Sequence, residues 1–416
     1  MIPLKILFAA VLCASAAVPA DESQNPNRYL HEAAEDPALK ESLDALYKFD
    51  YARTRELGLE FIRRHPQNPF WNLFLAGALW WEAATETWYG PPPTTLMTEF
   101  DKQVDFTIEK SKKLIRSEDK RRRTDGYFAA GMVLGLKGQM KLARGKYFGA
   151  YRNGKKGMKY LKKCVKIDPE YYDAYMGLGI FDYQVAVLPG ALRLGAKLLF
   201  RGTGDANRGI RRLRLAIDKG RFASSHAAAF LLTIYIQHER DYDRALSLTR
   251  HLLRDFPDSP YLLFVETALL NRTGDWPASY RSARALFERI NHDPRIFSRN
   301  QLGTICGLAA AGCFDRSNLE GAARWITKAL DASETEGEEV GQDWLAMLHL
   351  YRGLTLDILG KRSEAQADYG EAANLPDFGG TRVWGSFCWH RPCNTIDALA
   401  LLKGRAPDPG TSFGLP

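Results

Sequence analysis

Apolar and polar residues recur along this chain in a pattern that predicts paired amphipathic helices. The segment 50–69 returns as the segment 241–260, with the same residue types at the same offsets. The matching positions are Asp50 and Asp241, Tyr51 and Tyr242, Leu57 and Leu248, Arg63 and Arg254, Pro66 and Pro257, and Pro69 and Pro260. Each copy predicts a tight turn followed by a helix that ends at proline, because proline has no N–H to continue the helical hydrogen bonds.

Small residues mark further copies of the same unit. If Gly209, Ala245, Ser279, Ala322 and Ala365 are taken as equivalent, the steps between them are 36, 34, 43 and 43 residues. The first two steps match the 34-residue period of tetratricopeptide (TPR) repeats, and the later two require longer loops. Small side chains at such positions let two helices approach closely. The sequence therefore predicts an all-α fold, a right-handed α-solenoid of TPR-like helical hairpins.

A tyrosine-rich segment gives the chain a resemblance to known proteins. The run DPEYYDAYMGLGIFDY at residues 168–183 is followed by Leu188-Pro189, by Gly202-Thr203-Gly204-Asp205 and by Gly209. This combination resembles exported bacterial TPR proteins. It is more distantly similar to the eukaryotic tetratricopeptide repeat protein 39 family and its yeast relatives of the mitochondrial outer membrane. The resemblance implies a helical-repeat fold and a binding role, without any catalytic residue.

Residues 1–20 are typical of a secretory signal peptide. Lys5 provides the positive start, residues 6–17 are apolar, and Val18-Pro19-Ala20 supplies small residues for cleavage. A lipoprotein signal that uses Cys13 is the alternative, although Leu12 is bulkier than such sites prefer. No later window has the roughly 20 uninterrupted apolar residues that a spanning helix needs. We therefore expect an exported protein, periplasmic or secreted, with peripheral membrane association as an option.

Composition divides the rest of the chain into three parts. We expect an N-terminal linker at residues 21–35, a TPR-like repeat array at 36–377, and an irregular C-terminal cap and tail at 378–416. Three successive prolines at 91–93 predict a break in the array at 89–95, because a helix interior does not accept them. Glycines make the segment 378–391 look irregular.

Positive charge is concentrated in one block, although the formal net charge of the whole chain is only +8. Residues 110–163 hold 18 Lys and Arg against three acidic residues, whereas residues 331–377 hold 11 acidic residues against three basic ones. The densest parts form the candidate binding patch: Lys120, Arg121, Arg122, Arg123, Lys155, Lys156 and Lys159. A solvated helix face is the simplest interpretation. The binding interpretations are an acidic protein segment or anionic lipid head groups. Nucleic acid is not expected, because no nucleic-acid module is recognised.

Two further segments have both a binding and a packing interpretation. Arg193, Lys197 and Arg201 recur at four-residue spacing opposite apolar residues, as in an interfacial helix or in a hairpin helix that packs on its neighbours. Five aromatic residues favour internal packing over a ligand pocket. They are Trp71, Trp80, Trp81, Trp88 and Tyr89.

Five cysteines follow the signal peptide, and an exported chain can oxidise them. The close pairs Cys306 with Cys313 and Cys388 with Cys393 are candidate disulfides. Cys164 falls at a small-residue position of a repeat, which predicts a buried, inert thiol. The spacing of Cys388 and Cys393 is not that of a zinc or haem site, so no metal is predicted.

The sequence gives no motif for catalysis. Its eight histidines are scattered, and neither an H-E-x-x-H pair, a G-x-S-x-G elbow nor a P-loop is present. A hydrolase built on the C-terminal region is a remote alternative, since catalytic residues can converge from distant positions. We therefore predict a non-catalytic exported TPR scaffold, without cofactors, that mediates protein–protein interaction or assembly in the cell envelope. The alternative is a peripheral membrane protein that binds lipid through a basic helical face.

Overall fold

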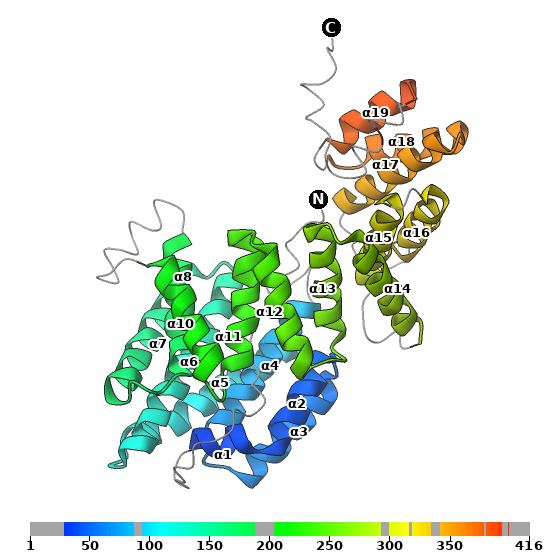
Figure 1. Ribbon diagram of the computed structural model, residues 1–416. Helices are drawn as coiled ribbons and strands as arrows, with labels where there is room; N and C mark the ends of the chain where they lie inside the picture. Colours follow the sequence, from blue (N-terminus) through cyan, green and yellow to red (C-terminus); the bar gives the residue numbers. More distant parts are fainter. Residues whose placement is uncertain are drawn as a thin grey trace. The chain divides into compact units, whose positions relative to one another are not determined.

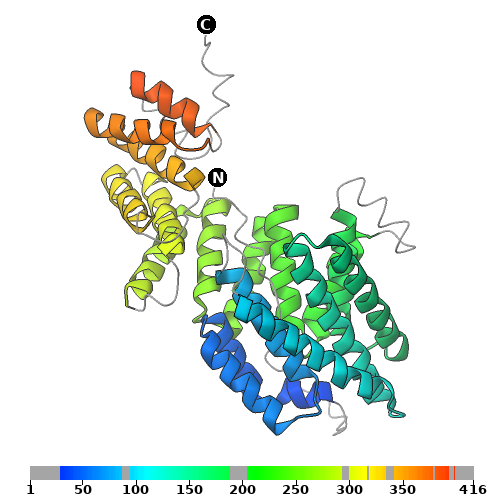
Figure 2. The ribbon, with the colours of Figure 1, turned by 180° about the vertical axis from the view of Figure 1, so that it is seen from behind.

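The computed structural model of this chain describes residues 29–86, 94–187, 204–292, 299–315, 318–333, 342–377, 380–392 and 398. Throughout this described part the regular structure is helical, and it contains no strand. The helices form two compact units (Figures 1 and 2). The N-terminal unit runs to Asp241 and includes His251–Pro257, and the C-terminal unit has Tyr242–Arg250 and the residues from Asp258 onward.

The N-terminal unit consists of helices that pack on their neighbours in the sequence, from α1 on α2 through to α10 on α11. It contains α1 (Tyr29–Glu35), α2 (Pro37–Tyr47), α3 (Tyr51–Arg64), α4 (Phe70–Glu86), α5 (Thr94–Ile115), α6 (Lys120–Ala143), α7 (Tyr147–Ile167), α8 (Ala174–Val187), α10 (Ala206–Lys219), α11 (Ser224–Ile234) and the π-helical turn η2 (Tyr235–Glu239).

The C-terminal unit repeats this arrangement, with each helix again packed on the next. Its helices are α13 (Pro260–Thr273), α14 (Trp276–His292), α15 (Arg299–Asp315), α16 (Leu319–Ser333), α17 (Gln342–Ile358), α18 (Arg362–Asn374) and α19 (Thr381–His390). Helix α12 (Tyr242–Asp255) has residues in both units. The predicted all-α solenoid of TPR-like hairpins is confirmed, and its division into two units is a feature that the sequence analysis does not predict.

Five hairpin turns share one backbone geometry. The residue two positions before the second helix has a positive φ, which is 63° at Phe49, 69° at Gly145, 52° at Arg240, 86° at Gly274 and 75° at Gly360. In four of these turns the next N–H donates to the carbonyl five residues earlier: Asp50 to Ala45, Lys146 to Lys141, Asp275 to Leu270, and Lys361 to Leu356. This Schellman-type bond closes the first helix and reverses the chain within a few residues.

The small residues that the sequence marks as equivalent occupy equivalent places in the structure. Each is the fourth residue of its helix, and each is buried. They are Gly209 of α10, Ala245 of α12, Ser279 of α14, Ala322 of α16 and Ala365 of α18. The repeat register is therefore confirmed. The two longer steps of 43 residues come from longer helices as well as longer connections: α14, α15 and α17 have 17 residues each, whereas α12 and α13 have 14 each.

Residues of the tyrosine-rich segment 168–183 join neighbouring hairpins. The buried Oδ1 atom of Asp173 accepts hydrogen bonds from three consecutive backbone N–H groups, those of Arg221, Phe222 and Ala223, at 3.0, 2.7 and 2.7 Å. Burial raises the pKa of Asp173, and the three N–H groups oppose that shift. The bonds fix the connection between α10 and α11 against the start of α8, so this carboxylate has a structural task.

The tryptophans of α4 lie in the core. Trp71, Trp80 and Trp81 are all buried. The Trp71 ring stacks on Phe61 of α3 with 3.8 Å between the ring centroids. The packing interpretation is therefore confirmed for these three residues, and Trp88 and Tyr89 lie outside the described residues.

The C-terminal end of the array differs from the sequence expectation. Residues 381–390 form helix α19, within the segment predicted to be irregular. The helix buries Thr381, Trp384, Gly385 and Cys388. These residues are spaced three, one and three apart, which is the spacing of one helix face. The prediction that this segment is irregular is wrong, because its helical periodicity outweighs the effect of its glycines.

Glycine pairs allow two hairpins to bring backbone against backbone. A Cβ atom on Gly157 of α7 would lie 2.7 Å from the carbonyl oxygen of Gly131 on α6. Likewise, a Cβ on Gly179 of α8 would lie 2.8 Å from the carbonyl oxygen of Gly209 on α10. A backbone oxygen cannot rotate away as a side chain can, so any larger residue at these sites forces the helices apart.

Two alanine substitutions on α7 test this close approach. Gly157→Ala should lower the free energy of unfolding by about 1–3 kcal/mol, since the added methyl group meets the Gly131 backbone. Gly154→Ala is the matched control, because nothing lies within 4 Å of its Cβ position. It should raise the free energy of unfolding by about 0.5–1 kcal/mol, because alanine favours helix. Denaturant titration measures both, and equal effects of the two substitutions would contradict the packing.

Candidate functional site: the basic face of the α6–α7 hairpin

The hairpin of α6 and α7 contains a long stretch without any acidic residue. Between Asp125 and Asp168 the sequence has 11 Lys and Arg residues and no Asp or Glu. Nearly all of this stretch lies within the two helices and the turn that joins them. Local ion pairs cannot form there, so the positive charge has to be offset from elsewhere or remain exposed.

Helix α7 gathers its basic residues on one side. They are Arg152, Lys155, Lys156, Lys159, Lys162, Lys163 and Lys166, and we call them the α7 stripe. All seven are exposed, and their spacing of three or four residues places them on one face of the helix. The opposite face is buried against the fold through Gly157, Met158, Leu161 and Cys164.

The stripe has no carboxylate partner within the part of the chain that the structure describes. Two of its lysines contact aromatic rings. The Lys155 Nζ lies 3.2 Å from the Tyr151 hydroxyl, and the Lys163 Nζ lies 5.2 Å from the Tyr127 ring centroid. Such contacts stabilise an ammonium group without neutralising it. The stripe therefore presents its full formal charge to solvent.

The structure separates the seven predicted patch residues into two groups. Lys155, Lys156 and Lys159 lie in the middle of the α7 stripe. Lys120 and Arg121 lie in the first turn of α6 and line a surface hollow with Asp119, Thr124 and Asp168.

The other two predicted residues turn toward the protein. The Arg122 guanidinium lies 5.7 Å from the Tyr29 ring centroid. The Nη1 atom of Arg123 donates to the Ser117 and Glu118 carbonyl oxygens at 3.1 and 3.3 Å. Sequence density alone groups all seven residues, whereas the α7 stripe follows helical periodicity. That periodicity adds four residues that are not among the seven of the predicted patch: Arg152, Lys162, Lys163 and Lys166.

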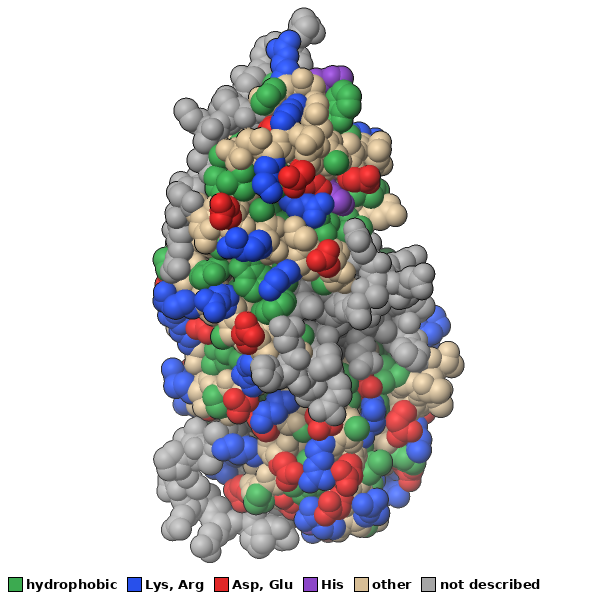
Figure 3. All heavy atoms as spheres, turned by 90° about the vertical axis from the view of Figure 1, so that its right-hand side faces the viewer, with side chains coloured by type: hydrophobic (Ala, Val, Ile, Leu, Met, Phe, Trp, Pro, Cys, Tyr) green, Lys and Arg blue, Asp and Glu red, His purple; other side chains and the backbone are tan. Residues whose placement is uncertain are grey.

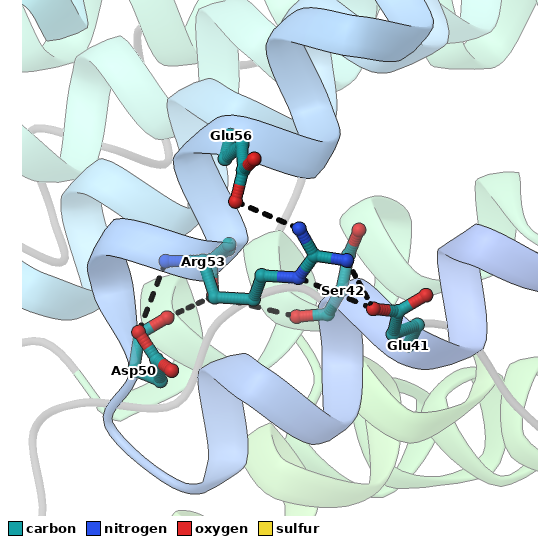
Figure 4. A network of polar contacts seen from close by, with 6 residues as sticks. Glu41, Ser42, Asp50, Arg53 and Glu56 are labelled. Carbon is teal, nitrogen blue, oxygen red and sulfur yellow. Dashed lines mark hydrogen bonds and ion pairs between the residues drawn. The ribbon is translucent and has the colours of Figure 1, made fainter.

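Several basic residues in other hairpins have carboxylate partners. Figure 4 shows Arg53 of α3, whose Nη2 and Nη1 atoms lie 2.6 Å from Glu41 of α2 and 2.7 Å from Glu56. These hydrogen bonds raise the pKa of Arg53. The same view shows Asp50 accepting the backbone N–H of Arg53 at 3.0 Å, which caps α3.

Buried carboxylates are paired in a similar way in both units. Asp182 of α8 accepts two hydrogen bonds from Arg208 at 2.8 Å each and forms an ion pair with Arg212. In the C-terminal unit, Arg352 of α17 donates two 2.8 Å bonds to Asp368 of α18, which also contacts His349. Compared with these arginines, the α7 stripe is charge that folding leaves unpaired.

The face of the molecule drawn in Figure 3 shows basic and acidic side chains interspersed. Mixed charge of this kind is ordinary for a soluble surface and provides no single-sign field. A run of one sign, as on α7, attracts partners of the opposite sign over a distance of about one Debye length, roughly 8 Å at physiological salt.

The described residues contain little that suggests chemistry. No group of three or more His, Cys, Asp or Glu side chains among them is placed to hold a metal ion. None of the helices searched in this part has the length and apolar character of a membrane span. Three expectations concern residues outside the described part and stay predictions. They are the signal peptide, the helix with Arg193, Lys197 and Arg201, and the break at 89–95, of which residues 89–93 are not described.

The cysteine predictions have mixed outcomes. Cys164, Cys306 and Cys313 are buried thiols outside any disulfide, as expected for Cys164. The predicted Cys306–Cys313 disulfide is wrong: seven residues along α15 separate the two α-carbons by about 10 Å, whereas a disulfide needs less than about 7 Å. Cys388 is disulfide-bonded. Its predicted partner, Cys393, lies outside the described residues.

Comparison with solved structures finds matches at low sequence identity. No family model matches the chain, and no curated protein matches it. Among solved structures, the P58(IPK) TPR domain matches at 14% identity and a TM-score of 0.24, covering 90% of this chain and 99% of that one. Yeast Tom70 matches at 12% identity and a TM-score of 0.26, covering 86% and 89%. At these TM-scores neither match supports an argument about this chain. The evidence for its fold is the pairing of consecutive helices and the shared geometry of the turns.

Thiol labelling tests the placement of the α15 cysteines. Burial raises the pKa of Cys306 to about 12 from its ordinary 9.0, so the folded protein should resist alkylation at about pH 8. The unfolded thiol ionises near its ordinary pKa. The folded state favours the protonated Cys306 thiol. Its contribution to the free energy of unfolding is therefore fully present below pH 9 and is lost as the pH rises toward 12. Mass spectrometry after alkylation without reductant, with and without denaturant, checks this. A recovered Cys306–Cys313 disulfide would contradict it.

Proposed function

We propose that this protein is a non-catalytic scaffold that binds a protein partner through its helical hairpins and acts in the cell envelope after export. Stacked hairpins support this role because they offer long exposed helix faces, as helical-repeat proteins do for their ligands. The proposal of export rests on the signal-peptide pattern of residues 1–20.

The observation behind the proposal is the α7 stripe. Each stripe residue has neighbours of the same sign three or four positions away, and such like-charged pairs each destabilise a helix by about 0.2–0.5 kcal/mol. Since these repulsions do not help the helix to fold, we infer that the arrangement serves binding. A partner with an acidic segment would remove the repulsion and fix the orientation of the complex.

The predicted partner therefore contacts α7 through Asp and Glu side chains. The stripe from Arg152 to Lys166 is about 20 Å long at the helical rise per residue, which suits an extended acidic segment of several residues. Binding of this kind depends mainly on solvent-exposed charge, so it should weaken as salt is added.

Crosslinking of the tagged protein in its native envelope, followed by mass spectrometry of the linked peptides, tests the proposal. We expect one reproducible protein partner with links that surround α7. Replacing Lys155, Lys156 and Lys159 together by Gln should reduce the yield of that link roughly tenfold, since three exposed pairs at about 0.5 kcal/mol each amount to about 1.5 kcal/mol.

The matched control replaces Lys102, Lys112 and Lys113 of α5 by Gln. These lysines are also exposed, and replacing them removes the same amount of charge. However, Lys102 and Lys113 already pair with Glu99 and Glu109. The control should keep the link. Equal losses in both variants would show that only net charge matters, and absence of any protein link would contradict the scaffold role.

A further inference from the structure

The turn between α6 and α7 presents seven consecutive exposed residues, 142–148, which we call the α6–α7 turn. Three of them have large apolar side chains with exposed fractions of 47% for Leu142, 68% for Tyr147 and 76% for Phe148. Other exposed large apolar residues in the described part, such as Leu59 and Phe106, have no such neighbour beside them in the sequence. Folding therefore leaves a small apolar end on this hairpin uncovered.

Basic residues surround the exposed side chains. Lys141, Arg144 and Lys146 are the charged residues of the turn and its borders, and no acidic residue occurs between Asp125 and Asp168. The Lys141 stem crosses from α6 to the start of α7, since its Cδ would lie 2.9 Å from a Cβ on Gly149. Exposed apolar side chains with cationic neighbours in the chain match the two layers of an anionic membrane surface, acyl chains below phosphates.

The backbone of the turn is hydrogen-bonded internally. Gly145 N–H donates to the Leu142 carbonyl at 3.0 Å, Lys146 N–H to Lys141 at 2.8 Å, and Tyr147 N–H to Gly145 at 3.0 Å. Entering a medium of low polarity is costly for unpaired backbone groups, and these three bonds reduce that cost for residues 145–147. Its shape is also fixed in advance, so little conformational entropy is lost on binding.

We propose that the α6–α7 turn inserts Leu142, Tyr147 and Phe148 among the head groups of an anionic bilayer, while its lysines and arginines contact the lipid phosphates. A convex end with two rings more than two-thirds exposed needs a matching pocket on a protein, whereas a head-group layer adapts to it. Aromatic side chains favour that layer. This proposal goes beyond the scaffold role, because it requires no protein partner and uses the end of the hairpin instead of the α7 stripe.

Vesicle sedimentation of the full chain tests the insertion. The probes are vesicles of phosphatidylglycerol with phosphatidylcholine, and vesicles of phosphatidylcholine alone. We expect the wild-type protein to bind the anionic vesicles and to be released as salt is added. Tyr147→Ser combined with Phe148→Ser should weaken that binding by roughly tenfold, because it removes the groups that enter the interface.

The matched control combines Leu59→Ser with Phe106→Ser, which removes apolar groups that are 43% and 41% exposed on other helices. It should bind vesicles as the wild type does. Retained vesicle binding in the control, with loss in the turn variant, supports the proposal. Equal loss in the two variants, equal binding to phosphatidylcholine alone, or no binding by the wild type would overturn it. The crosslinking experiment decides the scaffold role separately, because the turn variant keeps the whole α7 stripe.

Discussion

The structure depends on how closely consecutive helices can approach, and the hairpin turns and small residues together set that distance. A left-handed residue and a bond to the carbonyl five positions earlier end the first helix of a hairpin, as at Gly145 and Lys146. A glycine, alanine or serine then lets the second helix pack against the first, most closely where Gly157 faces Gly131. Stacking such hairpins buries a continuous core that one hairpin alone could not provide.

Electrostatics divides the charged residues into those that hold the hairpins together and those that do not. Asp182 and Asp368 are buried with arginines from the neighbouring helix, and removing one partner would leave an uncompensated charge. Asp173 uses backbone N–H groups for the same purpose. The α7 stripe has no such task, since its side chains reach solvent and lack carboxylates. A scaffold role accounts for it by placing the compensating charge on another molecule.

Sequence periodicity predicts most of the fold, because helix faces and capping turns are local properties. It places Gly209 and Ala365 correctly at equivalent positions of their helices. It fails where the direction of a side chain matters. The density of basic residues in the sequence groups Arg122 with Lys155, although Lys155 belongs to the exposed α7 stripe and Arg122 turns toward the Tyr29 ring. The proximity of Cys306 and Cys313 in the sequence likewise suggests a bond that a helix forbids. The division into two units follows from long-range contacts, which no local pattern contains.

We infer that folding does not require the charge of the α7 stripe, which leaves it available for binding. Thermal unfolding of a variant with Gln at all seven stripe positions, compared with the wild type in low and in high salt, tests this most directly. We expect the variant to unfold at a higher temperature than the wild type in low salt, because like charges no longer repel. The difference should vanish in high salt as screening removes the repulsion. A variant that unfolds at a lower temperature in both conditions would show that the α7 stripe stabilises the fold, and its charge would then not be spare for binding.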